Sequence, residues 1–222
     1  MTSTMSKRNI LLSSGIMLAL LVIGAIIWGY FTLPSNYISL DVNPSIEIQT
    51  NRLNQVVSIN PVNEDAKQVM AGYQLTDKNL EVVIKNIVDR MILYGYLAPD
   101  KDNQILITTD NKNATAELEK NINVIISTYL EEKQLNANLL QQSIKVETNS
   151  IEIAHENSIS AGKMALIEKL VHSDPTLTTE ELSKLRISDL TALAKAKNIN
   201  LDGLIDENND NDNGNVNDGQ SD

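Results

Sequence analysis

Cysteine is absent from the 222-residue chain, and histidine occurs only twice. Without cysteine there is no disulfide framework, no thiolate nucleophile and no cysteine-based metal site. His155 and His172 are too few for a metal cluster and share no ligand spacing with acidic residues, so we expect them at the surface or at helix caps. No Ser, His and Asp grouping is recognisable from the spacing. The sequence therefore predicts no metal site, no cofactor and no conventional hydrolase.

Basic residues are also scarce. The chain has 18 lysines and arginines against 29 aspartates and glutamates, a formal net charge of −11. All the acidic residues follow residue 33, so this part of the chain is strongly negative. Nucleic-acid binding is disfavoured because it needs basic patches. Aromatic residues make up only 4%, so a core must be built from isoleucine, leucine and valine.

Residues 202–222 contain seven acidic residues and no basic one. This composition predicts a disordered acidic tail. An EF-hand loop is the alternative, with Asn209, Asn211 and Asn213 as early ligands, Gly214 at its glycine and Gln220 in place of the bidentate glutamate. The loop has too few charges and the wrong final ligand, which favours a disordered spacer.

Residues 10–33 contain no charged side chain. As a helix, these 24 residues would span about 36 Å, enough to cross a hydrocarbon core of ~30 Å with some tilt. Lys7 and Arg8 precede the segment, which places residues 1–8 in the cytoplasm by the positive-inside rule. The alternative is a cleaved signal peptide, but the run is long and no A-x-A site follows. We expect a signal anchor over residues 9–33, an extracytoplasmic domain over 34–201 and a location in the cell membrane.

Two short stretches of alternating polarity flank Asn43-Pro44. Apolar residues alternate with polar ones over residues 38–42 and again over 45–49, a pattern typical of half-buried strands. Pro44 lacks a backbone donor, which a central strand does not accept. The dipeptide is therefore expected at an edge position, a bulge or a special site.

Asn-Pro bonds have a reactivity of their own. Proline has no N–H, so the usual attack of the next backbone nitrogen on the asparagine side chain is closed. The side-chain nitrogen of Asn43 can instead attack its own main-chain carbonyl and expel Pro44, provided that the fold strains the bond or holds a near-attack geometry. Asp41 and Ser45 flank the bond and have no assigned role. An ordinary turn is the common reading of Asn-Pro, and Asn60-Pro61 supplies an internal control.

The remaining pattern alternates strands and helices and predicts an α+β fold, with one mixed or mainly antiparallel sheet backed by helices. Strands are expected over residues 53–61, 104–109 and 143–148. Helices are expected over 63–71, from Thr76 to about 95, and over 114–134, 160–171, 178–186 and 188–197. Residues 160–163 (SAGK) are not a phosphate loop, because the first glycine is missing and Met164 stands at the hydroxyl position. Gly162 is instead expected to allow close packing.

Several of these blocks resemble the membrane-proximal ectodomain of RsgI-type anti-sigma factors. The resemblance covers roughly residues 36–200. It rests on residues 40–47 (LDVNPSIE), 51–52, 56–59 and 63–65 (NED), and on 159–163 (ISAGK) with 166–170. It implies a single-pass signalling protein that cleaves itself between Asn43 and Pro44. The two pieces would stay associated until their separation exposes the membrane stub to an intramembrane protease.

One departure affects the expected output. In that family the cytoplasmic part before the membrane segment binds the sigma factor, and only eight residues precede the segment here. Either the given sequence starts late, or the protein works through partners in the membrane or envelope. In both cases the sequence predicts no direct sigma-factor binding by the chain as given. The competing hypothesis is an uncleaved extracytoplasmic binding or scaffold module, in which Asn43-Pro44 is a structural bulge.

Overall fold

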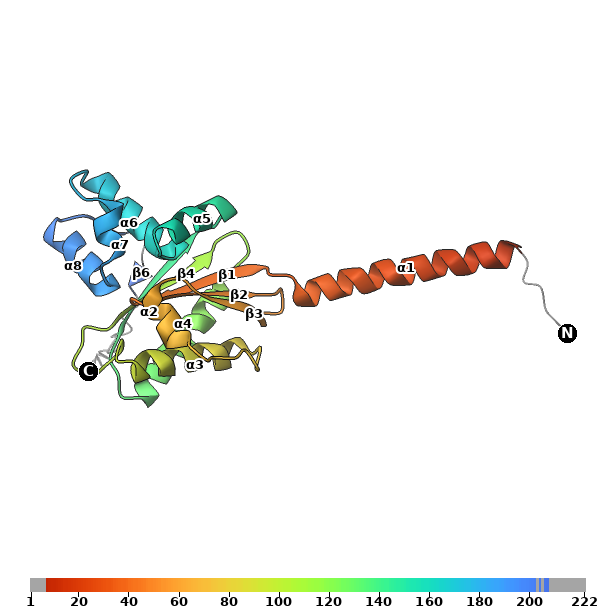
Figure 1. The fold of residues 1–222 in the computed structure, drawn as a ribbon, viewed down its shortest axis with the longest axis horizontal. Coiled ribbons are helices and arrows are strands. Elements are labelled where there is room, and N and C mark those ends of the chain that lie inside the picture. Colours follow the sequence, from red (N-terminus) through yellow and green to blue (C-terminus); the bar gives the residue numbers. More distant parts are fainter. Residues whose placement is uncertain (1–6, 203, 205, 208–222) are drawn as a thin grey trace, which may run out of the picture.

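The computed structural model of the protein describes residues 7–202, 204, 206 and 207. These residues form an α+β domain behind one long N-terminal helix, as Figure 1 shows. The strands are β1 Asn36–Asp41, β2 Ser45–Thr50, β3 Val56–Pro61, β4 Gln104–Asp110, β5 Asn138–Ile144 and β6 Asp206–Glu207. The helices are α1 Lys7–Thr32, α2 Glu64–Met70, α3 Leu80–Leu93, α4 Ala116–Glu132, α5 Thr148–Glu156, α6 Ala161–Ser173, α7 Thr179–Ser183 and α8 Ile187–Ala196.

The strands form one mixed sheet in the order β3-β2-β1-β4-β5-β6. Only β4 and β5 are parallel, and the other neighbours are antiparallel. The predicted fold class, a mixed and mainly antiparallel sheet with helices, is therefore confirmed. Strand β1 lies inside the sheet, between β2 and β4.

Helices cover both faces of the sheet, because the strands bury apolar residues on both sides. Ile38, Leu40 and Ile107 point to the face covered by α2, α3 and α4. Leu106 and Leu140 point to the opposite face and pack with α5 to α8. The domain thus has three layers, and polar β1 residues such as Ser39 and Asp41 are buried beneath α6.

Helix α1 is apolar and extends away from the domain (Figure 1). Its 26 residues rise about 39 Å, and residues 15–32 are long and apolar enough to cross a membrane. The end of α1 is tied to the sheet, since Asn51 Nδ2 donates to the Phe31 carbonyl at 2.6 Å and the Ser35 N–H donates to the Thr50 carbonyl at 2.7 Å. The end of α1 and the residues just after it are therefore hydrogen-bonded to the last residue of β2 and to the residue that follows it.

Several boundaries differ from the sequence prediction: β3 begins at Val56 and not at Leu53, and α7 ends at Ser183 and not at Arg186. Helix α3 is capped by Asn79, whose side chain accepts from Glu81 N and Val82 N, and not by Thr76. The preceding residues first pair with the start of β3, through the Val56 N–H and the Lys78 carbonyl, which delays the helix.

Strand β5 begins at Asn138, and the strand expected over residues 143–148 was wrong. Its parallel pairing with β4 runs from Gln104 opposite Asn138 to Asp110 opposite Ile144. Beyond that edge of the sheet the chain turns, and Glu147 begins the unpredicted α5.

Disorder from residue 202 onward was wrong for Asp206 and Glu207, which form β6 beside β5. The EF-hand candidates Asn209, Asn211, Asn213, Gly214 and Gln220 lie outside the described residues.

Candidate functional site: the Asn43-Pro44 turn

Asn43 and Pro44 lie in the tight turn that joins β1 to β2. The paired strands end at Asp41 opposite Ser45, and the Val42 N–H donates to the Pro44 carbonyl across the turn at 3.0 Å. Because Pro44 stands outside the ladder, its missing donor costs no strand hydrogen bond. The dipeptide is therefore neither an edge position nor a bulge. The register shift of this part of the sheet lies instead at Gln49 and Thr50.

Asn43 has an unusual backbone conformation, with a φ of 102°. The other described non-glycine residues with positive φ have values of 55–57°, inside the ordinary left-handed region. Asn43 lies beyond that region, where an L-residue is held only by its surroundings, at a cost of about 1–3 kcal/mol. The structure therefore strains the backbone at the residue whose bond was singled out.

The amide of Asn43 is held by the start of α2. Its Nδ2 donates to Asp65 Oδ2 at 3.0 Å, and its Oδ1 accepts from Asn63 Nδ2 at 2.9 Å. Asn63 is also the cap of α2, because its Oδ1 accepts from the Ala66 N–H at 2.9 Å, and from the Ser45 N–H at 3.3 Å. One short helix start therefore orients both ends of the Asn43 amide.

Sequence reasoning used Asn63 and Asp65 only as helix-start signals and missed their contact with Asn43. Residues 63–65 were already one of the blocks behind the family resemblance. Capping a helix requires only one of these three residues, so the resemblance over all of residues 63–65 was a signal that they have a further role, which is the contact with Asn43.

Asp41 is completely buried at the end of β1. Its Oδ2 accepts from the hydroxyls of Ser39 at 2.8 Å and Ser160 at 2.7 Å. Its Oδ1 and the hydroxyl of the facing Ser45 are buried without a partner in hydrogen-bond geometry among the described residues. Burial raises the pKa of Asp41, while the hydroxyls of Ser45, Ser160 and Ser39 act in the opposite direction. Asp41 and Ser45 thus lie at the turn, and Asp41 joins it to the start of α6 through Ser160.

Lys163 is the largest fully buried side chain of the domain. Its ammonium donates to the carbonyls of Ser183 at 2.9 Å and Leu185 at 2.6 Å, in the connection between α7 and α8. Burial lowers the pKa of Lys163 to about 8, and the negative charges of Asp41, Asp65 and Asp189 oppose that shift. Lys163 is not a phosphate ligand here. It supports a helix connection.

Gly162 lies against β4 as the sequence predicted. A Cβ at this position would come within 2.0 Å of Thr108 Oγ1 and 2.8 Å of Ser39 Oγ. The residue is thus required for the close approach of α6, which brings Ser160 to Asp41.

Asn60-Pro61 is in a different setting. Both residues belong to β3, the edge strand of the sheet, and Pro61 pairs with Ile46. Asn60 is not among the described residues with positive φ, and its side chain donates to Glu47 Oε2 at 3.1 Å. The two chemically equal bonds therefore differ in strain and in how their asparagine side chains are held.

The histidines also differ from each other. His172 is exposed in the last turn of α6, as expected. His155 lies in the last turn of α5 with 35% of its side chain exposed, and its Nε2 is 2.9 Å from Glu47 Oε2, a partner that the sequence did not predict. The Glu47 carboxylate, which is buried next to α5, also accepts a hydrogen bond from the Tyr37 hydroxyl at 2.8 Å, so both of its oxygens have polar partners. In the described part of the chain no three His, Asp or Glu residues are grouped as metal ligands.

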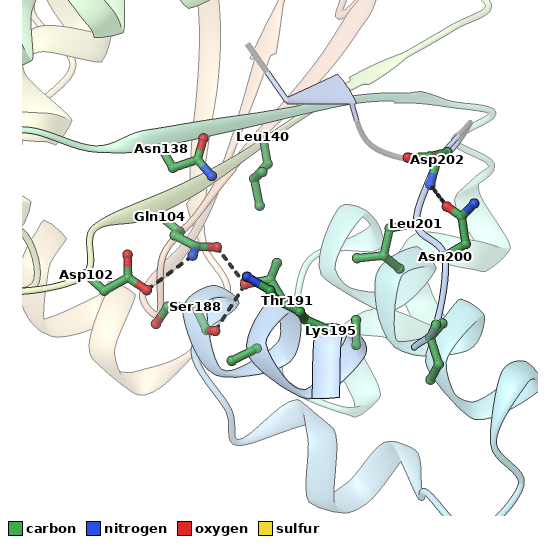
Figure 2. A pocket seen from close by; sticks show the side chains of 13 residues that line it. Asp102, Gln104, Asn138, Leu140, Ser188, Thr191, Lys195, Asn200, Leu201 and Asp202 are labelled. Atoms are coloured by element: carbon green, nitrogen blue, oxygen red, sulfur yellow. Dashed lines mark hydrogen bonds between the residues drawn. The ribbon is translucent and has the colours of Figure 1, made fainter. Parts of the chain in front are cut away.

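An open pocket of about 1000 Å³ lies between α8 and the beginnings of β4 and β5. Figure 2 shows Thr191 of α8 directed at Gln104 of β4, with a hydrogen bond of 2.7 Å between Thr191 Oγ1 and Gln104 Oε1. The pocket lining is mostly polar side chains and carries no cluster of catalytic groups. The turn at Asn43 is therefore the better candidate site.

The chain is thus an α+β domain that follows a helix long and apolar enough to cross a membrane, with a strained Asn-Pro turn between the first two strands of its sheet. Residues 35–169 match the profile of the anti-sigma factor RsgI-like central domain. The match spans more than half of the chain, which therefore belongs to the RsgI family.

Individual relatives agree with this family. The chain is 27% identical to anti-sigma-I factor RsgI7 of Acetivibrio thermocellus over 188 residues, which is 83% of this chain and 34% of that protein. It is 24% identical to RsgI3 of the same organism over 216 residues, 90% of this chain and 32% of that protein. Anti-sigma-I factor RsgI of Bacillus anthracis is 26% identical over 127 residues, 57% of this chain and 27% of the relative. The chain thus spans about a third of the length of the curated relatives it matches.

Proposed function

We propose that this protein is a membrane-anchored, self-cleaving domain in a cell-envelope pathway that regulates an alternative sigma factor. The observation that carries the proposal is the strained Asn43, whose amide is held at both ends by Asn63 and Asp65. The names of the relatives, all anti-sigma-I factors, support the regulatory pathway. The held asparagine supports the chemistry.

The proposed reaction is an intramolecular transfer at one carbonyl. Asn43 Nδ2 forms a bond to the main-chain carbonyl carbon of Asn43, and the bond from that carbon to the Pro44 nitrogen breaks. One proton leaves Nδ2 and one arrives at the Pro44 nitrogen, which becomes a free secondary amine. The N-terminal piece then ends in a succinimide, and no water or cofactor is consumed in this step.

The neighbours of Asn43 suit this transfer. Asp65 Oδ2 accepts an N–H of the attacking nitrogen, so it can take up the proton that the nitrogen loses. Asn63 donates to Asn43 Oδ1 and stabilises the negative charge that a deprotonated amide carries on oxygen. Holding the side chain in place also removes the rotational entropy that makes the unassisted reaction slow. Asp41 and Ser45 flank the turn; Asp41 ties it to the start of α6 through Ser160, and the Ser45 N–H ties it to Asn63 at the start of α2.

The two pieces would remain together without the peptide bond. Strand β1 belongs to the N-terminal piece and lies between β2 and β4 of the C-terminal piece. Ile38 and Leu40 of β1 are fully buried, and the Asn36 side chain donates to Thr50 and Asn54. Release of β1 therefore requires breaking two strand ladders and exposing a core strand. Such a complex is stable at rest and separable by force or denaturation.

The arrangement relative to the membrane follows from the charges around α1. Lys7 and Arg8 precede the apolar segment and the acidic residues follow it, which supports residues 1–8 in the cytoplasm, residues 9–33 across the membrane and residues 34–201 outside. After separation of the pieces, α1 and β1 would remain as a stub in the membrane. An intramembrane protease is the class of partner that acts on such a stub.

The test compares two alanine variants of the full chain. Wild type, Asn43→Ala and Asn60→Ala are purified in detergent and analysed by denaturing electrophoresis and by native size-exclusion chromatography. The proposal expects two fragments for wild type and Asn60→Ala under denaturing conditions, one native peak for both, and a single chain for Asn43→Ala. A single chain in all three samples would refute self-cleavage and favour an uncleaved binding module.

A further inference from the structure

The turn is held from a third side, by the beginning of α8. The backbone N–H of Ile187 donates to the carbonyl of Val42 at 3.1 Å. Ile187 is the first residue of α8, so its N–H has no acceptor within its own helix. The acceptor, the Val42 carbonyl, belongs to the peptide unit immediately before Asn43. The φ angle of Asn43 is the rotation of this peptide plane about the N–Cα bond of Asn43, so a hydrogen bond that fixes the Val42 carbonyl also restrains φ.

Helix α8 is itself kept in place by α6. The Lys163 ammonium binds the carbonyls of Ser183 and Leu185, just before α8 begins. Ser160, at the start of the same helix α6, donates to Asp41 next to the turn. A second anchor comes from Thr191 of α8 to Gln104 of β4 (Figure 2). The C-terminal helices are thus connected to the turn by a continuous set of hydrogen bonds.

We propose that the Ile187 N–H is a positioning group for the Asn43-Pro44 bond, and that Lys163 acts through α8 to keep it in place. Residues 183–187 lie beyond the residues 35–169 that match the family profile, so nothing in that match assigns them to the turn. In this arrangement the cleavage geometry depends on docking of α7 and α8. A chain whose last helices are undocked would hold Asn43 only through α2 and would cleave more slowly. The inference rests on the proposed self-cleavage, but its test includes amide exchange at Val42, a measurement that does not depend on cleavage.

The chain offers a substitution that removes this hydrogen bond without breaking one inside the helix, although it also removes part of a fully buried side chain. Proline is favoured at the first position of a helix, where its missing N–H breaks no helical bond. Arg186, the preceding residue, has φ −74° and ψ 164°, which is the conformation required before proline. Ile187→Pro therefore fits the backbone and deletes the donor to Val42.

Two controls separate the donor from packing and from proline itself. Ile187→Val has the same number of side-chain carbons as Ile187→Pro and keeps the N–H, so it matches the loss of buried volume. Thr179→Pro places proline at the first position of α7, where the capping residue Thr178 is also extended, with φ −121° and ψ 145°. Lys163→Met, which removes the donor to Ser183 and Leu185, should act in the same direction as Ile187→Pro.

The experiment follows newly made full chain in lipid nanodiscs. Cell-free synthesis is stopped, and the cleaved fraction is measured with time by intact mass. In parallel, backbone amide exchange at Val42 is measured by NMR for each variant in an Asn43→Ala background, which keeps the chain uncut, since this N–H closes the turn. Ile187→Pro should cleave roughly threefold to tenfold more slowly than Ile187→Val, the factor equivalent to one backbone hydrogen bond. The Val42 amide should exchange faster by a similar factor, while Thr179→Pro should match wild type in both readouts.

Equal cleavage rates and equal Val42 exchange in Ile187→Pro and Ile187→Val would overturn the positioning role. If wild type is not cleaved at all, the proposed function fails and the Val42 exchange alone decides. Faster Val42 exchange in Ile187→Pro than in Ile187→Val would then show that α8 holds the turn, and equal exchange in the two variants would refute this role of α8.

Discussion

Gly162→Ala tests how tightly α6 is seated on the sheet. The added Cβ would lie 2.0 Å from Thr108 Oγ1 and 2.6 Å from Thr108 Cβ. Neither atom is the end of a flexible chain, because Thr108 is fully buried in a central strand and its hydroxyl accepts from Gln142 at 2.7 Å. Helix α6 or strand β4 must therefore shift.

The expected size follows from two opposing effects. Overpacking a well-packed contact costs about 1–3 kcal/mol, and replacing glycine by alanine in a helix returns up to about 1 kcal/mol. The free energy of unfolding should therefore fall by about 1–2 kcal/mol, and the Tm by roughly 2–8 °C. Without the close approach, the same substitution would raise stability, so the sign of the change decides.

The assay is thermal and urea unfolding of the full chain in an Asn43→Ala background, which is expected to keep the chain single. Thr108→Ala in combination with Gly162→Ala removes the nearest atom and should recover part of the loss, a coupling that marks the contact as the cause. An unchanged or increased Tm for Gly162→Ala would refute the close seating of α6.

Two further predictions concern the charged groups around the turn. The pKa of Lys163 is lowered to about 8, so below pH 8 the folded and the unfolded chain both bind the proton, whereas between pH 8 and about 10.5 only the unfolded chain keeps it. The free energy of unfolding of wild type should therefore rise over this range by about 3 kcal/mol relative to Lys163→Met, as measured by denaturant titration. A difference that does not change with pH would contradict a buried ammonium. Asp65→Asn keeps an acceptor oxygen but removes the basic group beside Asn43 Nδ2, so cleavage of freshly made protein should slow. The control Glu64→Gln makes the same charge change on an exposed side chain one residue earlier and should leave the cleavage rate unaltered. Equal cleavage rates in the two variants would exclude Asp65 from the reaction.

Local signals predicted much of the fold. The helix beginning after Ser160 was correct because the cap, the apolar spacing and Gly162 all act within one segment. The two strands around Asn43 were located correctly because each carries a clear alternation, but the prediction that they are half-buried was wrong, since helices cover both faces of the sheet and bury the polar positions as well. The missed features depend on distant partners. The start of β5 is set by its parallel register with β4, and the start of α3 by pairing of the preceding residues with β3.

The same distinction applies to the candidate site. Asn43-Pro44 was found from the chemistry of a dipeptide, and its reactivity stays a prediction. The groups that hold it come from α2, α6 and α8, as Asn63, Ser160 and Ile187 show. No spacing in the sequence relates a helix start near residue 187 to a turn at residue 43. Only the folded sheet, with α6 and α8 packed against it, brings these groups together.

The most direct test of self-cleavage is the mass of the two pieces of freshly made, denatured wild-type protein. The account predicts a C-terminal piece that begins with Pro44 and an N-terminal piece that ends at Asn43 and is one water lighter than the hydrolysed product, as a succinimide requires. The Asn60-Pro61 bond should be intact in the same sample. A single uncut mass, or an N-terminal piece that already carries the water when first formed, would contradict cleavage by the Asn43 side chain.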